Sequence, residues 1–319
     1  MAWMSETCIV VGKYFNSPMR FRHLVSVVVL IFVWTWYASL PQSVEICNKH
    51  PIPAPPRTDV SCPVTWVTAY YRFSSKHSVE EYNAWIRNFQ AIRMCVVVFT
   101  DVLDMWLHLP NTTLVVPTSL CPVALYHLKL SVSEWQKQFS MDPERGIHRH
   151  FMVYWVWALK TFFLNSTVTS NPFNSNAFFW IDAGYFRDDQ HDGLDIRSMR
   201  TRLVPDRGLV FLQRYPFTKD EINMVEDGRV RHPVLENRMG GGMFGGHAQG
   251  VRDWTGAYEA ELAMYQARNW FVGKDQVLMA SICLTKPWLC TGVAPLHNTG
   301  VDEWMSLFES VINASDVGH

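Results

Sequence analysis

The sequence predicts an α/β protein with a mostly parallel sheet flanked by helices, preceded by one transmembrane helix. Short apolar runs rich in β-branched residues alternate with longer segments of helical periodicity, which predicts the sheet and its helices. One uncharged apolar segment near the N-terminus predicts the membrane helix. The composition fits a folded body, because 48% of the 319 residues are hydrophobic and only 18% are charged.

Residues 23–40 are the predicted membrane helix and signal anchor. The uncharged part would span roughly 25 Å as a helix, which nearly crosses a bilayer core. Three basic residues precede it: Lys13, Arg20 and Arg22. The positive-inside rule then places residues 1–22 in the cytoplasm and the body in the lumen of the Golgi or endoplasmic reticulum. A cleaved signal peptide is the alternative, since Ala38 and Ser39 are small, but the long lead favours an uncleaved anchor.

Two features after residue 40 agree with a luminal body. Three N-glycosylation acceptor sequences occur there, at Asn111, Asn165 and Asn313. Six of the seven cysteines also lie there, an even number that could pair in an oxidising compartment. Proximity along the chain favours the pairs Cys47–Cys62 and Cys283–Cys290, whereas Cys95 lies in an apolar run and could be a buried free thiol.

Residues 41–63 are the predicted stem: the five prolines between residues 51 and 63 favour an extended polyproline conformation and predict a short, stiff segment. Residues 64–319 contain no repeat, low-complexity tract or second linker, so we expect a single catalytic domain there. The formal net charge is −1, which lacks the basic character of a nucleic-acid-binding protein. Nucleic acid is therefore excluded as an expected partner.

The elements of this domain are predicted in order from hydrophobic patterning and capping signals. An Asn171-Pro172 turn follows the helix predicted from Ile147 to about Leu164. The elements are a strand at 64–69, a helix from the capping box of Ser78 and Glu81 to about Ile92, strands at 94–101 and 114–117, a helix from Ile147 to about Leu164, and a strand at 177–184.

Polar residues follow these strands at their carboxyl ends, where ligands enter open parallel sheets. Tyr71 and Arg72 follow the first strand, Asp101 closes the second, and Asp182 and Arg187 come at the end of the strand at 177–184. Such a set could hold a nucleotide diphosphate, with a carboxylate on a divalent cation and basic groups on the phosphates. The alternative for each aspartate is a helix cap or turn.

Three later segments offer further candidates. RMGGGMFGG (238–246) places five glycines in seven positions, so its backbone either approaches a ligand closely or forms a bulged strand beside a bulky neighbour. GKDQ (273–276) puts Asp275 at the start of a helix, where it is either functional or simply stabilised by the helix dipole. His297 in PLHNTG is either a metal ligand or a structural residue.

Taken together, these segments resemble the HtrL/YibB family of glycosyltransferase-like proteins over about residues 64 to 285. The resemblance implies a GT-A-like fold, a nucleotide-sugar donor, an acceptor on a glycan, lipid or protein, and a divalent cation, Mn²⁺ or Mg²⁺. The match comprises VTAYYRF, KHSVEEYNAWIRNF, VVFTD, DPERGIHRHFMVYWVWALK, NPFNSNAFFWIDAGYFR, RMGGGMFGG and GKDQ.

The resemblance also implies roles for individual residues. Asp182 takes the place of the acidic strand-end motif and would hold the cation with His297, while Asp275 would face the acceptor as the catalytic base of an inverting reaction. A retaining reaction would need no base there, and the two remain open. The expected donor-binding residues are Tyr71, Arg72, Asp101, Lys160, Asp182, Arg187, Gly241 and Gly242.

One departure from the GT-A pattern bears on the activity. Many GT-A enzymes have a D-x-D motif, whereas Asp182-Ala183-Gly184 supplies only one carboxylate. A membrane-anchored sugar-binding protein or an inactive glycosyltransferase relative is therefore the alternative to an active glycosyltransferase.

Overall fold

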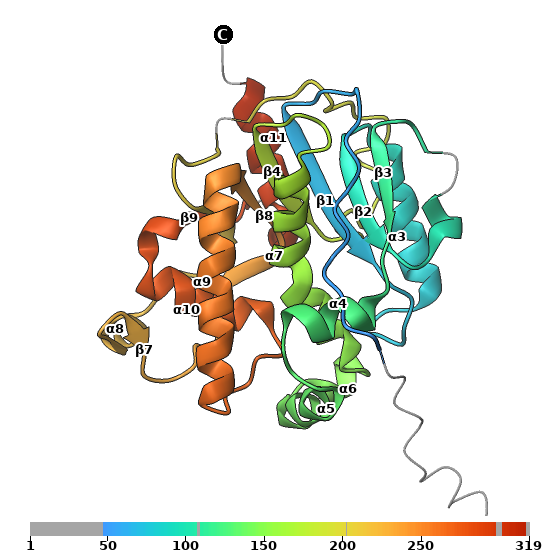
Figure 1. Ribbon diagram of the computed structural model, residues 1–319. Helices are drawn as coiled ribbons and strands as arrows, with labels where there is room; N and C mark the ends of the chain where they lie inside the picture. The colour runs from blue at the N-terminus through green and yellow to red at the C-terminus, as the bar shows by residue number, and fades with distance from the viewer. Residues whose placement is uncertain (1–46, 107–108, 202, 298–301, 317–319) are drawn as a thin grey trace, which may run out of the picture. The chain divides into compact units, whose positions relative to one another are not determined.

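The computed structural model describes residues 47–106, 109–201, 203–297 and 302–316. These residues form a central sheet with helices on both faces (Figure 1). Within these ranges, no helix combines the length and apolar character that a membrane span requires. The predicted anchor at 23–40 lies outside the described residues, so it stays a prediction.

The sheet has seven strands in the order β3-β2-β1-β4-β8-β5-β9. Neighbouring strands are parallel except at β8, which is antiparallel to both β4 and β5. The predicted mostly parallel α/β architecture is therefore confirmed. The strands are β1 (Val64–Tyr70), β2 (Val96–Thr100), β3 (Thr113–Pro117), β4 (Ala177–Ile181), β5 (Leu209–Gln213), β8 (Met239–His247) and β9 (Cys290–Val293).

Helices cover both faces of this sheet because successive side chains in a strand point to opposite sides. In β1, Trp66 joins the core on one face and Val67 joins the core on the other. The Val67 face packs against α4 (Leu120–His127), α5 (Val132–Met141), α7 (Met152–Ser170), α9 (Ala248–Ala267) and α10 (Asp275–Thr285), and the Trp66 face packs against α3 (Val79–Ala91) and α11 (Leu307–Asp316).

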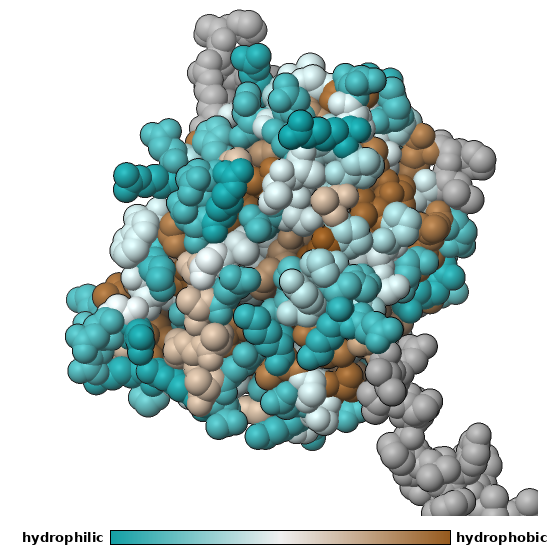
Figure 2. All heavy atoms as spheres, viewed as in Figure 1, coloured by the Kyte–Doolittle hydropathy of each residue, from teal (hydrophilic) through white to brown (hydrophobic). Residues whose placement is uncertain are grey.

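Polar residues dominate the face that carries α7 and α9, and apolar residues show mainly in narrow areas between the polar ones (Figure 2). Short elements join the main ones: η1 (Leu103–Trp106), α6 (Arg145–His148), α8 (Lys219–Asn223), the hairpin of β6 (Val225–Glu226) and β7 (Arg229–Val230), η2 (Pro287–Leu289) and η3 (Glu303–Met305).

The strands predicted near 64, 94, 114 and 177 are all present, as is the capping box. The Ser78 hydroxyl accepts the Glu81 N–H at 3.2 Å, and the Glu81 carboxylate accepts the Ser78 N–H at 2.8 Å. The helix predicted from Ile147 begins at Met152 instead, because Arg149 has a φ of 63° and separates it from α6. Asn171, with a φ of 43°, ends α7 at the predicted turn.

The glycine-rich segment is a strand, β8, whose pairing with β5 shifts register between Phe211 and Leu212. Close packing requires a glycine at Gly245, where a Cβ would lie 2.5 Å from the Phe179 ring. This confirms the expectation of a bulged strand beside a bulky neighbour.

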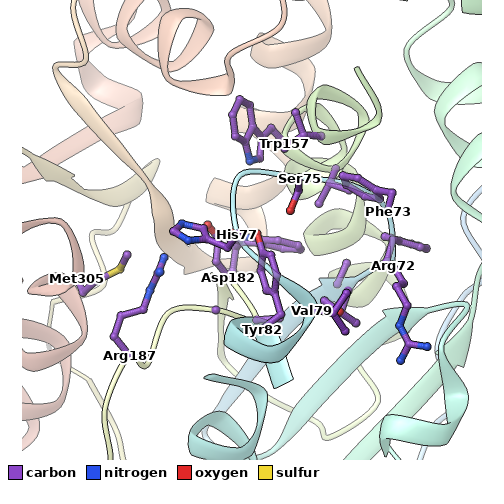
Figure 3. A pocket seen from close by; sticks show the side chains of 18 residues that line it. Arg72, Phe73, Ser75, His77, Val79, Tyr82, Trp157, Asp182, Arg187 and Met305 are labelled. Atoms are coloured by element: carbon purple, nitrogen blue, oxygen red, sulfur yellow. The ribbon is translucent and has the colours of Figure 1, made fainter. Parts of the chain in front are cut away.

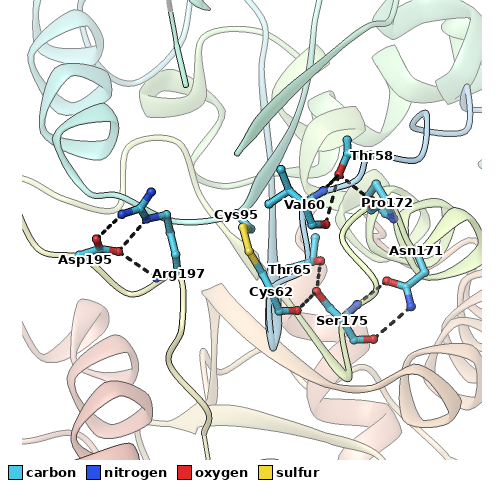
Figure 4. Close-up of a disulfide and its surroundings, with 10 residues drawn as sticks. All are labelled: Thr58, Val60, Cys62, Thr65, Cys95, Asn171, Pro172, Ser175, Asp195 and Arg197. Carbon is cyan, nitrogen blue, oxygen red and sulfur yellow. Dashed lines mark hydrogen bonds and ion pairs between the residues drawn. A yellow bond between two sulfur atoms is a disulfide. The ribbon is translucent and has the colours of Figure 1, made fainter. Parts of the chain in front are cut away.

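The structure contains the disulfides Cys47–Cys121, Cys62–Cys95 and Cys283–Cys290. The predicted Cys283–Cys290 pair is confirmed, but Cys47–Cys62 is wrong and Cys95 is not a free thiol. Cys62 and Cys95 precede the adjacent parallel strands β1 and β2 and so lie side by side (Figure 4). Proximity in sequence could not reveal this pairing, because the sheet brings the two residues together.

Residues 47–63, the described part of the predicted stem, pack against the domain, and the compact unit begins at Cys47. Thr58 N–H and Cys62 N–H donate to the carbonyls of Pro172 and Phe173 at 3.0 and 2.9 Å, and Figure 4 shows Thr58 beside Pro172. Prolines keep this segment extended, as expected, and the buried Ile52 donates its N–H to His127 Nε2 at 3.2 Å.

Candidate active site

A cleft opens at the sheet edge where β1 and β4 end and β8 begins. Tyr70 pairs with Thr100 at the ends of β1 and β2, and the Asp182 N–H donates to the Gly242 carbonyl at 2.8 Å, which sets Asp182 beside β8. The cleft has a cavity volume of about 420 Å³, which is enough for a ligand of several rings. The carboxyl edge therefore carries the cavity that the sequence predicted there.

A second, narrower pocket of about 120 Å³ adjoins this cleft and shares residues with it. Figure 3 shows His77, Tyr82, Asp182 and Arg187 gathered around this pocket, with Trp157 on the far side. The two cavities together form one continuous site with an aromatic pocket and a polar cleft.

Lys160 of α7 lies at the floor of the cleft and joins two carboxylates. Its Nζ lies 3.0 Å from Asp182 Oδ1 and 3.1 Å from Asp275 Oδ2, and it donates to the Gly241 carbonyl at 2.8 Å. Lys160 also donates to Asp182 Oδ2 at 3.3 Å, so it holds Asp182 and the Gly241 carbonyl by hydrogen bonds and Asp275 by charge. Asp182 Oδ1 also accepts the Trp180 indole N–H at 2.7 Å, so the carboxylate orientation is fixed.

Burial and neighbouring charges shift the pKa values of Lys160 and Asp275 in opposite directions. Burial lowers the pKa of Lys160, but Asp182 and Asp275 outweigh it and hold that pKa above its ordinary value. Burial raises the pKa of Asp275, and Lys160 offsets this only in part. Lys160 is therefore a buried cation whose charge is kept by its two neighbours.

Asp275 is the first residue of α10, as the GKDQ segment predicted. Its side chain is only 5% exposed, and its Oδ1 accepts the Gln276 N–H at 2.9 Å. Gln276 in turn donates to the Met239 carbonyl at 2.9 Å, which fastens the helix start to β8. Held in this way by Lys160 and the helix N-terminus, Asp275 is poorly placed for the base role predicted for it.

Basic and aromatic groups line the upper part of the site. The Arg187 guanidinium lies 3.6 Å from the Trp85 ring centroid, a cation–π contact that fixes the arginine beside the cleft. His77 meets the same Trp85 ring edge to face at 4.7 Å. Lys76 and Lys274 also line the cleft. An anionic ligand would find several positive groups here, which suits a diphosphate.

A second buried group in the cleft wall was missed by sequence reasoning. Asp142 Oδ2 lies 2.6 Å from His148 Nδ1 and accepts the Tyr154 hydroxyl at 2.6 Å. Glu144 lies beside His148 and pairs with Lys274 at 2.7 Å. The sequence does contain a signal for this group: in the DPERGIH segment, Asp142 and Glu144 are followed by His148 just before a long helix.

Asp142, Glu144 and His148 have ligand atoms within 4.8 Å of one another and could hold a metal ion. The predicted pair of cation ligands is arranged differently: Asp182 lines the cleft, whereas His297 is exposed and its Nδ1 lies 3.0 Å from Glu303 Oε1. His297 as a metal ligand stays a prediction.

Most of the residues predicted for donor binding meet in this site. Asp101 is exposed at the end of β2 and lines neither of the two cavities. Arg72 lines the smaller pocket, but in Figure 3 its guanidinium points away from His77 and Arg187. The residues brought together are Lys160, Asp182, Arg187, Gly241, Gly242 and Asp275 in the cleft, and Tyr71, Arg72, Asp182 and Arg187 in the smaller pocket.

Neither a protein-family model nor a curated protein matches the sequence. Among solved structures, the chain is similar to the crystal structure of mouse xyloside xylosyltransferase 1 in its apo form, with a TM-score of 0.37 and 10% sequence identity. The similarity covers 72% of this chain and 84% of that chain. At this distance the similarity assigns neither the fold nor the activity of this chain.

Proposed function

We propose that this chain is a glycosyltransferase that moves a sugar from a nucleotide-sugar donor to an acceptor hydroxyl. The observation that carries the proposal is the Lys160 ammonium between Asp182 and Asp275, at the floor of a cleft lined by Arg187 and other cations. Fixed carboxylates accept hydrogen bonds from sugar hydroxyls, and fixed cations bind the diphosphate of the donor. The resemblance of the sequence to the HtrL/YibB family points the same way.

The geometry suggests how a donor would lie. The smaller pocket is lined by aromatic side chains such as Tyr71 and Tyr82, which suit a nucleobase and ribose. The diphosphate would then reach Arg187, and the sugar would lie over Gly241 and Asp275, which both line the cleft. In this pose the donor spans both cavities.

Transfer breaks the bond between the anomeric carbon and the diphosphate, so negative charge develops on the leaving group. Arg187, with Lys76 and Lys274, would stabilise that charge. Lys160 is buried and engaged with Asp182, Asp275 and the Gly241 carbonyl, so we infer that it acts on the donor through the carboxylates that it holds rather than on the phosphates.

The exposure of the two carboxylates indicates where a divalent cation, Mn²⁺ or Mg²⁺, would bind in this site. Asp182 is about one-third exposed and faces the cleft, while Asp275 is turned towards Lys160. Asp182 would therefore be the protein ligand, and donor phosphate oxygens would supply further ligands, as is common for Mg²⁺. The cation would neutralise phosphate charge, and we expect it to bind appreciably only together with the donor.

Membrane anchoring through residues 23–40 and a location in the Golgi or endoplasmic reticulum also remain proposals. Three disulfides in the described chain support an oxidising compartment. Asn111 is exposed in a turn before β3, which suits an N-linked glycan. An acceptor on a glycan, lipid or protein would be found in that compartment.

The second candidate function is sugar binding without turnover. It is favoured by the single carboxylate in Asp182-Ala183-Gly184 and by the ion pair that occupies Asp275. Both candidates predict carbohydrate binding, but only a transferase needs to bind the nucleotide part of a donor and to turn it over.

The test is a thermal-shift screen of nucleotide sugars against the full chain, with and without Mn²⁺, followed by donor hydrolysis and transfer assays. A transferase should be stabilised by one nucleotide sugar, by an amount that grows with the logarithm of its concentration over Kd, and Mn²⁺ should strengthen that effect. Asp182→Asn should abolish the Mn²⁺-dependent part of donor binding while keeping the fold. Asp59→Asn, at an exposed position that lines neither cavity, is the matched charge control. Binding of free sugars with no binding of any nucleotide sugar would instead support the sugar-binding function.

A further inference from the structure

The Asp142–His148 pair is a buried dyad that the proposed donor site does not use. Asp142 is fully buried, and its carboxylate accepts three donors: the His148 ring and the Tyr154 hydroxyl at 2.6 Å each, and the Glu144 N–H at 2.8 Å. Burial raises the pKa of Asp142, but these hydrogen bonds outweigh it and hold that pKa below its ordinary value. Asp142 is therefore an ionised acceptor.

This arrangement decides which nitrogen of His148 carries the proton. An ionised carboxylate can only accept hydrogen bonds, so His148 Nδ1 must donate. In the neutral imidazole the other nitrogen, Nε2, is then left with a lone pair. The ring is also held by an edge-to-face contact with Trp157, with centroids 5.0 Å apart, so the direction of Nε2 is fixed.

His148 lines the same cleft as Asp182, Gly241 and Asp275. Its Nε2 lies 3.6 Å from Glu144 Oε2, and that carboxylate is paired with Lys274, the neighbour of Asp275 in sequence. The dyad therefore stands in the cleft wall beside the start of α10 and lines the same cavity as the residues over which the donor sugar would lie. The left-handed φ of 63° at Arg149, directly after His148, ends α6 at this point.

A metal site built from the same residues fits the contacts less well. Asp142 would have to give up donors that already occupy three of its acceptor positions, and Glu144 would have to leave Lys274. A histidine that binds a metal through Nε2 commonly donates its Nδ1–H to a carboxylate. In that arrangement, Asp142 would orient the ring, and only His148 and Glu144 would remain as ligands.

We propose that His148 is the general base that deprotonates the acceptor hydroxyl, with Asp142 as its positioning residue; this inference rests on the proposed glycosyl transfer. The acceptor O–H proton passes to His148 Nε2 as the acceptor oxygen bonds to the anomeric carbon. The bond from that carbon to the diphosphate breaks, and the diphosphate leaves with the electron pair. Displacement by this route inverts the anomeric configuration. A positioned base of this kind contributes roughly 10² to 10⁴ in rate.

The first measurement needs no substrate. Nitrogen-15 NMR of the histidine rings in the full chain should show that the neutral form of His148 carries its proton on Nδ1 and leaves Nε2 bare, and Asp142→Asn should shift this tautomer balance. A wild-type His148 protonated on Nε2 alone would overturn the inference whatever the donor turns out to be.

The second measurement separates proton transfer from binding. With the donor found in the screen, His148→Gln should keep the donor Kd within about threefold but lower the single-turnover transfer rate by roughly 10² to 10⁴. Added imidazole should restore part of the rate of His148→Ala, which a purely structural role would not allow. His232→Gln, an exposed histidine outside both cavities, is the control.

The outcomes distinguish this inference from the proposed function. If the wild-type chain binds no nucleotide sugar, the proposed function fails and the inference falls with it. If the wild type transfers sugar while His148→Gln transfers at a near-normal rate, the inference alone is overturned. Loss of Mn²⁺ or Zn²⁺ binding in His148→Gln, with wild-type transfer dependent on that metal, would also overturn it in favour of a metal site.

Discussion

Gly241 lies directly against Asp275, because a Cβ at position 241 would be only 2.7 Å from Asp275 Oδ2. The same Gly241 offers its carbonyl to Lys160, which bridges Asp275 and Asp182. A side chain on β8 at this point would therefore push on a buried, ion-paired carboxylate. The glycine keeps the ion-paired floor of the cleft intact.

We predict that Gly241→Ala displaces Asp275 and weakens donor binding. The added methyl group must move either the carboxylate or β8, and the donor sugar is proposed to lie there. The donor Kd should rise at least tenfold, with a loss of stability of about 1 to 3 kcal/mol from overpacking. Isothermal titration and urea denaturation measure the two effects.

Gly256→Ala is the matched control, since a Cβ at that position on α9 meets no atom within 4 Å. It should leave donor binding unchanged and stabilise the helix by about 0.5 to 1 kcal/mol. Equal donor affinity in Gly241→Ala and the wild type would show that this part of β8 does not contact the sugar.

Lys160→Met should be among the most destabilising substitutions in the chain. It leaves Asp275 buried without its cation and Asp182 without its main partner, and breaking a buried ion pair costs about 3 to 5 kcal/mol. The double variant Lys160→Met/Asp275→Asn removes the orphaned charge as well and should recover about half of the loss. Urea denaturation of wild type, both single variants and the double variant forms the thermodynamic cycle.

Additive effects in this cycle would mean that the two side chains do not interact in solution. Lys137→Met, which removes an exposed lysine from α5, should change the free energy of unfolding by less than about 0.5 kcal/mol. It thereby separates the ion pair from a general effect of charge.

The sheet and its active edge were predictable from the sequence because they follow from local patterns. β1, β2 and β4 are short apolar runs, and parallel strands place Asp182 at the ligand-binding edge. The partners of each residue were not predictable in this way. Lys160 and Asp275 come from helices far apart in the chain, and their ion pair depends on packing that no spacing encodes. Cys62 and Cys95 likewise meet only through strand pairing.

His127 should make the free energy of unfolding depend on pH. Its Nε2 accepts the Ile52 N–H at 3.2 Å, and burial lowers its pKa to about 4. Between pH 6.5 and 4 the unfolded chain binds a proton at this residue and the folded chain does not, so stability should fall as the pH falls through this window. Above pH 6.5 the effect is absent, and below pH 4 it is constant. The loss should reach about 1 to 3 kcal/mol, reduced by partial exposure.

Urea denaturation at pH 7, 6, 5 and 4.5 measures this effect in wild type and in His127→Gln, which keeps an acceptor but does not titrate. The difference in unfolding free energy between the two proteins should shrink as the pH falls. Parallel pH profiles would exclude His127 as the cause and would leave the carboxylates responsible for any acid instability.

The last prediction concerns the disulfide that ties the start of the domain to α4. Cys47 and Cys121 close a loop with a sequence separation of 74, whereas Cys283 and Cys290 are separated by 7. In the chain-entropy model, closing the longer loop stabilises the fold by about 4 kcal/mol and closing the shorter one by about 2 kcal/mol. Cys47→Ser/Cys121→Ser should therefore lower the free energy of unfolding about twice as much as Cys283→Ser/Cys290→Ser. Peptide mapping of the unreduced protein checks the pairing itself, and a Cys47–Cys62 peptide would contradict it. Neither Cys47 nor Cys121 lines either cavity. The folded fraction of Cys47→Ser/Cys121→Ser should therefore bind the donor as the wild type does.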